Sequence, residues 1–149
     1  MAKNVVLKDR DGNELNTSKI LFEGKLKIYN NLSNEDLTNN LIQLKECLVN
    51  NKDNYTAFLF LIEDNYNDFN IEKTEIGMFD SVALTLMFAN SGWQPSHWTK
   101  IVIYTSGNID IAMSNADENN CSIYFNNGVT TIDGEAPLYI NINKIIGIK

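Results

Sequence analysis

The side chains in this sequence that could do chemistry gather mainly in two stretches. The first, residues 91–98, holds Trp93, Trp98 and the one histidine, His97, with Ser96 beside it. A serine or cysteine nucleophile would need His97 as its base, but Ser96 lies outside the Gly-x-Ser-x-Gly elbow that exposes such a serine. No His-Glu-x-x-His motif and no phosphate-binding glycine loop occurs either. The sequence therefore contains no recognisable nucleophile–base motif.

The second stretch is acidic and follows an apolar run at residues 55–62. It offers carboxylates for the acid–base pair that glycoside cleavage needs, and its members are Glu63, Asp64, Asp68, Glu72 and Glu75. The plainer interpretation, which we adopt, is solvated charge on a loop. Asp9, Asp11 and Asn13 are spaced like half of a calcium loop, but the distal bidentate glutamate is missing. We therefore expect no catalytic residue, no metal site and no cofactor, and we do not predict an enzyme.

Trp93, His97 and Trp98 are the candidate ligand-binding residues. Exposed aromatic rings stack on sugars and offer contact area at a low entropic cost. The sequence thus offers a Trp-containing loop as a carbohydrate-binding or receptor-binding site. The alternative is that both rings cover one end of the fold or lie in a subunit interface.

Cys47 and Cys121 are the two cysteines, and they fit no metal-ligand spacing such as Cys-x-x-Cys. Cys47 falls in a helical pattern, and Cys121 begins a strand-like run. We expect both to be small, buried or half-buried apolar residues. A disulfide or a reactive thiol is the alternative.

Length and charge exclude several classes of protein. A chain of 149 residues is long enough for one domain with a real core. Its net charge of −7 argues against nucleic-acid binding and against an anionic membrane surface. No apolar run reaches the roughly 20 residues that span a bilayer, and the N-terminus lacks the apolar centre of a signal peptide. We therefore expect a protein made in a cytoplasm, without a nucleic-acid or membrane partner.

One helix is predicted at about 33–50. Ser33 provides an N-cap with Asp36 three residues later, and leucines follow at helical spacing on one face. Strands are predicted from apolar runs and period-two alternation, at residues 26–28, 55–62, 81–89, 99–105, 109–113, 121–125, 128–132 and 138–148.

Short turns join the later strands, among them Ser106-Gly107-Asn108 and Asn126-Asn127-Gly128. Such turns favour antiparallel pairing. The sequence thus predicts a mainly β fold with one helix. We expect an antiparallel β-sandwich or meander, with the amphipathic helix packed on it.

An N-terminal anchoring segment at residues 1–20 is predicted to precede a single β-rich body at 21–149. The apolar run Val5-Val6-Leu7 leads into Asp11-Gly12, a pair that suits the positive φ angles of hairpin turns. This pattern predicts a short β-ribbon. The polar residues 16–19 that follow are turn-like, and we expect a hinge there.

The stretch Val5-Val6-Leu7-Lys8-Asp9-Arg10-Asp11-Gly12-Asn13 resembles the opening segment of bacteriophage virion proteins. Tail-fibre, head-fibre and baseplate components often begin with Val-x-Leu-Lys-Asp-x-Asp-Gly-Asn. Residues 98–103 and 107–111 are similar to a hairpin of phage fibre and receptor-binding tips. Asp110 and Ala112 stand where that pattern has Tyr and Arg, which argues against an inherited ligand contact at this hairpin.

The resemblance implies a phage or prophage virion structural protein, such as a fibre, a baseplate component or a capsid-decoration protein on the capsid surface. It implies a location in the virion after synthesis in the bacterial host cytoplasm. The expected partners are other virion proteins, bound through the anchor residues Val5, Val6, Leu7, Asp11 and Gly12. A cyclic homotrimer is expected from the resemblance, whereas symmetry rules alone favour a dimer. The alternative function is a module that binds a carbohydrate or receptor, with a host surface glycan as a candidate ligand, through the Trp-containing loop.

Overall fold

The structure is a computed structural model, and it describes residues 5–8, 10, 14–64, 70–75, 82–89, 98–114 and 120–149. These residues form ten strands and one helix. The strands make two five-stranded sheets in which every pairing is antiparallel. The prediction of a mainly β fold with one helix is confirmed.

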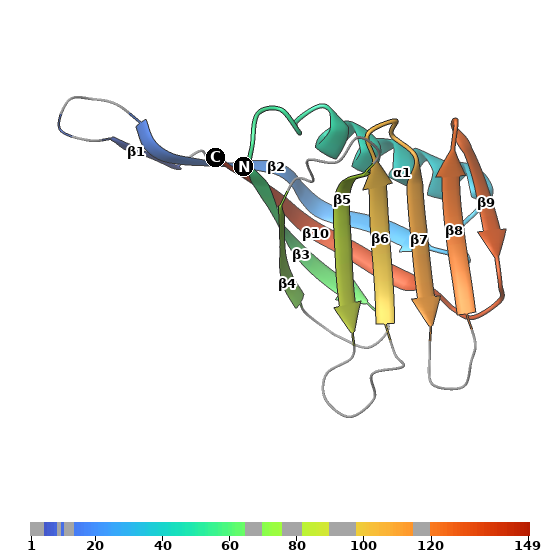
Figure 1. Cartoon of the computed structure of the whole chain (residues 1–149). Helices are drawn as coiled ribbons and strands as arrows, with labels where there is room; N and C mark the ends of the chain where they lie inside the picture. Colours follow the sequence, from blue (N-terminus) through green and yellow to red (C-terminus); the bar gives the residue numbers. More distant parts are fainter. Residues whose placement is uncertain are drawn as a thin grey trace.

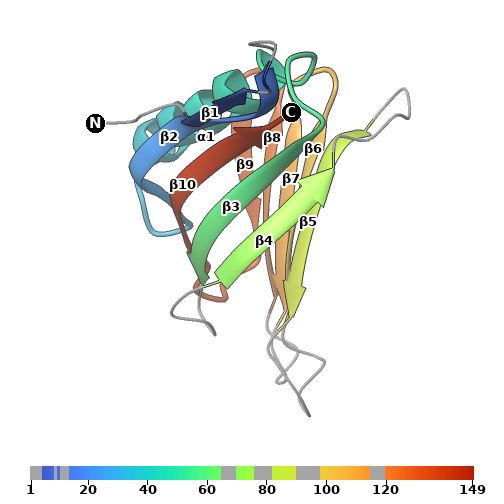
Figure 2. The ribbon, with the colours of Figure 1, turned by 90° about the vertical axis from the view of Figure 1, so that its left-hand side faces the viewer.

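The two sheets divide the chain into an earlier and a later set of strands, except that the last strand returns to the first sheet. Sheet A has the order β1 (Val5–Lys8), β2 (Glu14–Tyr29), β10 (Tyr139–Ile148), β3 (Ala57–Asp64) and β4 (Asn70–Glu75). Sheet B has the order β5 (Val82–Ala89), β6 (Trp98–Tyr104), β7 (Ile109–Ser114), β8 (Asn120–Asn126) and β9 (Val129–Asp133). Sheet B lies over sheet A with its strands crossing those of sheet A steeply (Figure 1). β4 and β5 lie side by side where the sheets meet at one edge (Figure 2).

The strands of both sheets alternate buried and exposed side chains, so each sheet has one buried face. The core lies between these two faces. In β6, for example, Thr99, Ile101 and Ile103 are buried, while Lys100 between them is exposed. One continuous apolar cluster joins the two inner faces. Its largest members are Phe58, Phe60 and Phe125, with isoleucines and leucines from both sheets.

The helix α1 (Asn34–Val49) closes the sandwich on the side away from β4 and β5. Its N-cap is Ser33, whose side chain accepts a hydrogen bond from the Asp36 amide at 3.1 Å, as predicted. The buried residues of α1 are the four leucines of the predicted stripe, Leu37, Leu41, Leu44 and Leu48. They belong to the same apolar cluster as the inner faces of the sheets.

Hydrogen bonds tie α1 to one strand of each sheet. The side-chain amide of Asn40 donates to the Lys27 carbonyl of β2 at 2.8 Å. The side-chain amide of Asn34 donates to the Thr130 carbonyl of β9 at 3.2 Å. The Thr38 and Thr130 hydroxyls are hydrogen-bonded at 2.6 Å. The helix therefore covers strand edges whose backbone groups would otherwise be open to pairing with another chain.

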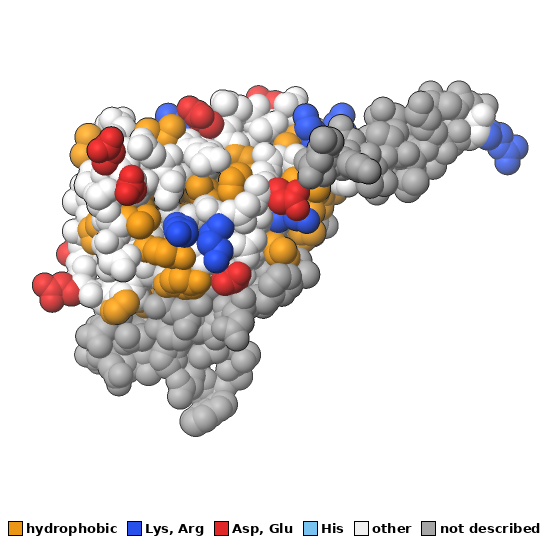
Figure 3. All heavy atoms as spheres, turned by 180° about the vertical axis from the view of Figure 1, so that it is seen from behind, with side chains coloured by type: hydrophobic (Ala, Val, Ile, Leu, Met, Phe, Trp, Pro, Cys, Tyr) orange, Lys and Arg blue, Asp and Glu red, His pale blue; other side chains and the backbone are white. Residues whose placement is uncertain are grey.

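The outer face of sheet A mixes apolar and charged side chains. Leu59 and Leu61 of β3 alternate with the buried phenylalanines and are half-buried. The Lys144 ammonium lies 3.4 Å from the Glu23 carboxylate. Figure 3 shows apolar side chains on this side of the molecule, with lysine and acidic side chains among and around them.

The N-terminal ribbon is β1 paired with the first residues of β2. Val5 pairs with Ser18 and Lys8 with Glu14, with a register shift between Leu7 and Lys8. β10 pairs with β2 only from Ser18 onwards, so residues 14–17 have β1 as their neighbour in the sheet. The ribbon therefore extends beyond the body (Figure 1).

One prediction about local structure is wrong, and one strand was missed. Residues 16–19 lie inside β2 and form no hinge, since this strand runs unbroken from Glu14 to Tyr29. β4 (Asn70–Glu75) was not expected and pairs with β3 along its whole length. The turns at Gly107 and at Asn127-Gly128 are confirmed, with positive φ angles of 89°, 53° and 82°. The one helix of the described residues is too short to cross a membrane.

Cys47 and Cys121 are free thiols. Cys121 is fully buried, and its sulfur accepts a hydrogen bond from the side-chain amide of Asn30 at 3.3 Å. Cys47 is half-buried on α1. Burial raises the pKa of the Cys47 thiol to about 11 and also raises the pKa of Cys121. The expectation of small, buried or half-buried residues is confirmed.

Alkylation of Cys47 by iodoacetamide should therefore be slow at pH 8, roughly a hundredfold slower than in the unfolded chain, because the thiolate is the nucleophile. The rate should rise about tenfold per pH unit towards pH 11. The Cys47 thiol ionises at a lower pH in the unfolded chain than in the folded protein. The free energy of unfolding therefore decreases as the pH rises from about 9 to about 11. Mass spectrometry of the alkylated protein would measure the rate, with the denatured protein as the control. A rate that levels off below pH 9 would contradict the raised pKa.

Candidate functional site

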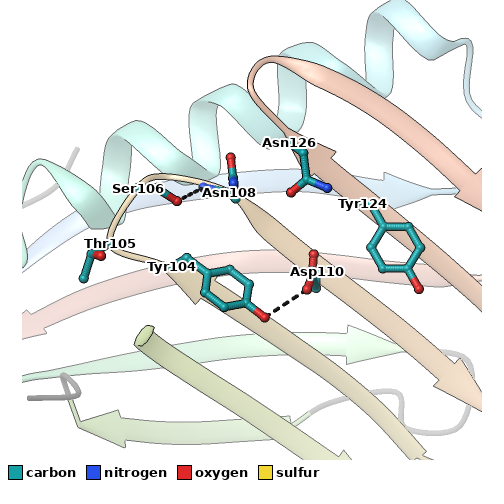
Figure 4. A pocket seen from close by; sticks show the side chains of 7 residues that line it. All are labelled: Tyr104, Thr105, Ser106, Asn108, Asp110, Tyr124 and Asn126. Carbon is teal, nitrogen blue, oxygen red and sulfur yellow. Dashed lines mark hydrogen bonds between the residues drawn. The ribbon is translucent and has the colours of Figure 1, made fainter. Parts of the chain in front are cut away.

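A hollow of about 560 Å³ opens on the outer face of sheet B, at the end where β6 turns into β7. It is lined by Tyr104, Thr105, Ser106, Asn108, Asp110, Tyr124 and Asn126 (Figure 4). These residues come from the adjacent strands β6, β7 and β8 and from the turn between β6 and β7. Period-two alternation places them on the outer face, because their neighbours Ile103, Ile109 and Phe125 are buried.

The strand register brings the polar and aromatic side chains together. Asp110 of β7 lies directly opposite Tyr124 of β8 and opposite Val102 of β6. Tyr104 is two residues further along β6, which is a diagonal neighbour position. Its hydroxyl donates a hydrogen bond to Oδ2 of Asp110 at 3.0 Å. This bond to Asp110, together with burial, raises the pKa of Tyr104 and keeps its hydroxyl protonated.

The turn between β6 and β7 is held from both sides. The Ser106 hydroxyl accepts a hydrogen bond from the backbone N–H of Asn108 at 3.4 Å. Oδ1 of Asn108 accepts one from the backbone N–H of Asn127 at 3.1 Å. Gly107 has φ of +89°, and a side chain there would meet Lys45 of α1. The turn is thus tied to the β8–β9 turn and packed against the helix, which fixes the rim of the hollow.

Polar groups remain available at this hollow. Within the described residues, Oδ1 of Asp110, the Tyr124 hydroxyl and the Asn126 side-chain amide make no hydrogen bond. Tyr124 is 37% exposed, which leaves part of its ring open to a ligand. The hollow thus presents aromatic rings together with unsatisfied donors and acceptors, as a binding site does.

A smaller hollow of about 230 Å³ continues along the same face. It shares Tyr104, Asp110 and Tyr124 with the first and adds Lys100 and Val102 of β6 and Ile111 and Ala112 of β7. Lys100 and Asp110 thus line the same hollow, with no ion pair between these two described side chains. The two hollows form one surface along β6 and β7.

Another hollow, of about 640 Å³, lies where β9 leads into β10, and the polar groups of Tyr29, Asn30 and Tyr139 in its lining are used internally. The rings of Tyr29 and Tyr139 are stacked 4.7 Å apart, and the fully buried Asn141 is hydrogen-bonded to both hydroxyls. The Asn30 side chain donates to the Ala136 carbonyl at 2.8 Å and accepts from the Leu138 amide at 3.0 Å. This network holds the β9–β10 connection, so its polar groups have less left to offer a ligand.

The candidate residues from the sequence are only partly described. Val5, Val6 and Leu7 lie on β1, whereas Asp11 and Gly12 fall outside the described residues. Trp93 and His97 also fall outside them, and Trp98 is half-buried at the start of β6. Trp98 is two residues from Lys100, roughly 7 Å along the strand, and six residues from Tyr104, roughly 20 Å, and it lines neither hollow. The structure therefore does not bring Trp98 to the hollow, and the Trp-loop site stays a prediction.

Four of the five acidic residues lie on strands and not on a loop. Glu63 and Asp64 end β3, Glu72 and Glu75 belong to β4, and Asp68 falls outside the described residues. The half-buried Glu63 accepts a hydrogen bond from the Asn143 amide at 2.7 Å. The placement of these residues on a loop was wrong for these four. Among the described residues no group of three or more metal-ligating side chains gathers.

The sequence alone did not reveal the site formed by Tyr104, Asp110, Tyr124 and Asn126. Asp110 was noted only as a departure from a phage-fibre pattern. The alternation along β6 and β8 could have indicated part of this site. It places Tyr104 and Tyr124 on the polar face of strands whose other face is buried. Their meeting across β7 depends on strand register, which the alternation does not give.

Comparison of the chain with protein-family models, with curated proteins and with solved structures finds no match.

Proposed function

We propose that this chain is a structural component of a phage or prophage particle, either a fibre, a baseplate protein or a capsid-surface protein. It assembles through its N-terminal ribbon and does no catalysis. The observation that supports this proposal is that the ribbon extends past the end of β10. A two-stranded ribbon on its own is marginally stable in water, so it gains stability by joining a partner.

Strand addition is the mechanism that this geometry supports. β1 is the end strand of sheet A, and β2 is its one neighbour among the described strands. The other edge of β1 therefore has backbone donors and acceptors available for a strand of a neighbouring virion protein. The phage-like segment Val5–Asn13 coincides with β1 and the residues that follow it. We carry over the cyclic homotrimer and the virion location from the same resemblance.

Deletion of residues 1–17 should abolish incorporation into particles and leave the body folded, since β10 pairs with β2 only from Ser18. Tagged full-length and truncated chains would be expressed in the bacterial host during particle production. Purified particles would then be probed for the tag. A peptide of residues 1–19 in excess should compete with the full chain, whereas a scrambled peptide should not.

The outcomes separate folding from anchoring. Circular dichroism and thermal unfolding of the truncated chain check that the body is intact. A folded truncated chain that enters particles as well as the full chain would refute the ribbon as the anchor. A full-length chain that is absent from the purified particles would refute the virion role itself.

A further inference from the structure

We propose that the outer face of sheet B binds an uncharged oligosaccharide across Tyr104, Asp110 and Tyr124. This inference does not depend on particle assembly. It rests on the two joined hollows over β6, β7 and β8 and on the groups that line them. The site is made of other residues than the Trp-containing loop.

The hydrogen-bonding groups at the hollow match those of a sugar. Each sugar hydroxyl both donates and accepts. Oδ1 of Asp110 offers an acceptor, the Tyr124 hydroxyl offers both functions, and the Asn126 amide offers a donor and an acceptor. These groups have no partner among the described residues, so a ligand would complete their hydrogen bonds without displacing any bond shown within the fold.

The aromatic rings supply the apolar part of the contact. Figure 4 shows the rings of Tyr104 and Tyr124 on either side of Asp110, above the strands that carry them. A sugar ring has apolar C–H faces that pack against an aromatic face, while its hydroxyls reach outwards. Tyrosine gives such contact at a low entropic cost. The Tyr104–Asp110 hydrogen bond holds one ring and the carboxylate in place before a ligand arrives.

Charge favours a neutral ligand over a charged one. Lys100 and Asp110 line the same smaller hollow, so the surface carries one positive and one negative side chain. The chain's net charge of −7 would also repel anionic ligands such as phosphorylated or sulfated sugars. A basic peptide that bound the Asp110 carboxylate would be repelled by Lys100, which lines the same hollow.

The length of the surface favours more than one sugar residue. From Lys100 to Tyr104 the strand advances roughly 13 Å at the usual rise of an extended chain. The hollows continue around Asp110 and Tyr124 to the turn at Asn108. We therefore infer an extended oligosaccharide that lies along β6 and β7.

The test is binding of the full-length chain to an immobilised panel of neutral glucose, galactose, mannose and N-acetylglucosamine oligomers, followed by calorimetric titration of the best binder. Tyr124→Ala should weaken binding by about tenfold or more because it removes a ring. Tyr124→Phe keeps the ring and should lose less. Asp110→Asn should weaken binding, while Asp53→Asn, the same change at an exposed carboxylate outside the site, should leave it unchanged.

Three results would overturn the proposal. One is no binding to any member of the panel at millimolar concentration. Another is binding that Tyr124→Ala and Asp110→Asn leave intact. The third is tighter binding of an oligolysine peptide than of any sugar, lost in Asp110→Asn, because it would assign this face to a basic partner. Tyr124 and Asp110 lie outside the core. Thermal unfolding of each variant, expected to be unchanged, would check that the fold is retained.

Discussion

Gly134→Ala should destabilise the fold by about 2–5 kcal/mol. Gly134 lies between β9 and β10 with φ of +92°, and a Cβ there would lie 2.2 Å from the Asn120 carbonyl oxygen and 3.2 Å from the Cys121 Cα. Both atoms belong to the backbone of β8, which cannot move without disturbing its pairing with β7 and β9. Urea unfolding monitored by circular dichroism would measure the change.

Gly128→Ala is the matched control. Gly128 has φ of +82°, and nothing lies within 4 Å of the position that its Cβ would take. This variant therefore suffers only the backbone strain of a left-handed residue, about 1–2 kcal/mol. Equal losses at the two glycines would contradict the close approach of Gly134 to Asn120.

The predictions that succeeded rest on local chemistry. The cap at Ser33 and the leucine spacing are determined within one helix, and the Asn127-Gly128 turn needs only two residues with positive φ. The strands β3 and β5 were recognisable because both of their sequences are dense in apolar residues. In each case the cause and the structure lie within a few residues of one another.

The failures share a physical reason. Residues 16–19 are polar and yet lie in a strand, because residues 16–18 pair with β1 and residues 18–19 pair with β10. β4 has the sequence NIEKTE, and its pairing with β3 sets its conformation more than its own propensity does. Strand pairing between distant segments overrides local composition at both places.

The candidate site illustrates the same limit. Tyr104 and Tyr124 are separated in the chain by the β6–β7 turn, the whole of β7 and the connection to β8. They lie on either side of Asp110 only because β7 pairs with β6 and β8 in one register. A shift of one residue would turn Asp110 into the core and Ile111 outwards. The buried side chains Ile109, Ile111 and Met113 exclude that shift.

Leu41→Ala should cost about 2–5 kcal/mol of stability, because it leaves a cavity where α1 meets both sheets. Leu41 is fully buried in the central apolar cluster. Gln43→Ala removes a side chain of similar length from the exposed side of the same helix and should change stability by less than about 0.5 kcal/mol. Alanine favours the helix at both positions, so the difference measures packing and not helix propensity.

The weakened helix should also expose the strand edges that it covers. When α1 loosens, the Lys27 carbonyl of β2 and the Thr130 carbonyl of β9 lose their Asn40 and Asn34 partners. Open edges pair with other chains, so Leu41→Ala should aggregate faster on mild heating than Gln43→Ala, as measured by light scattering. Equal stability and equal aggregation of the two variants would mean that α1 neither completes the core nor shields the sheets.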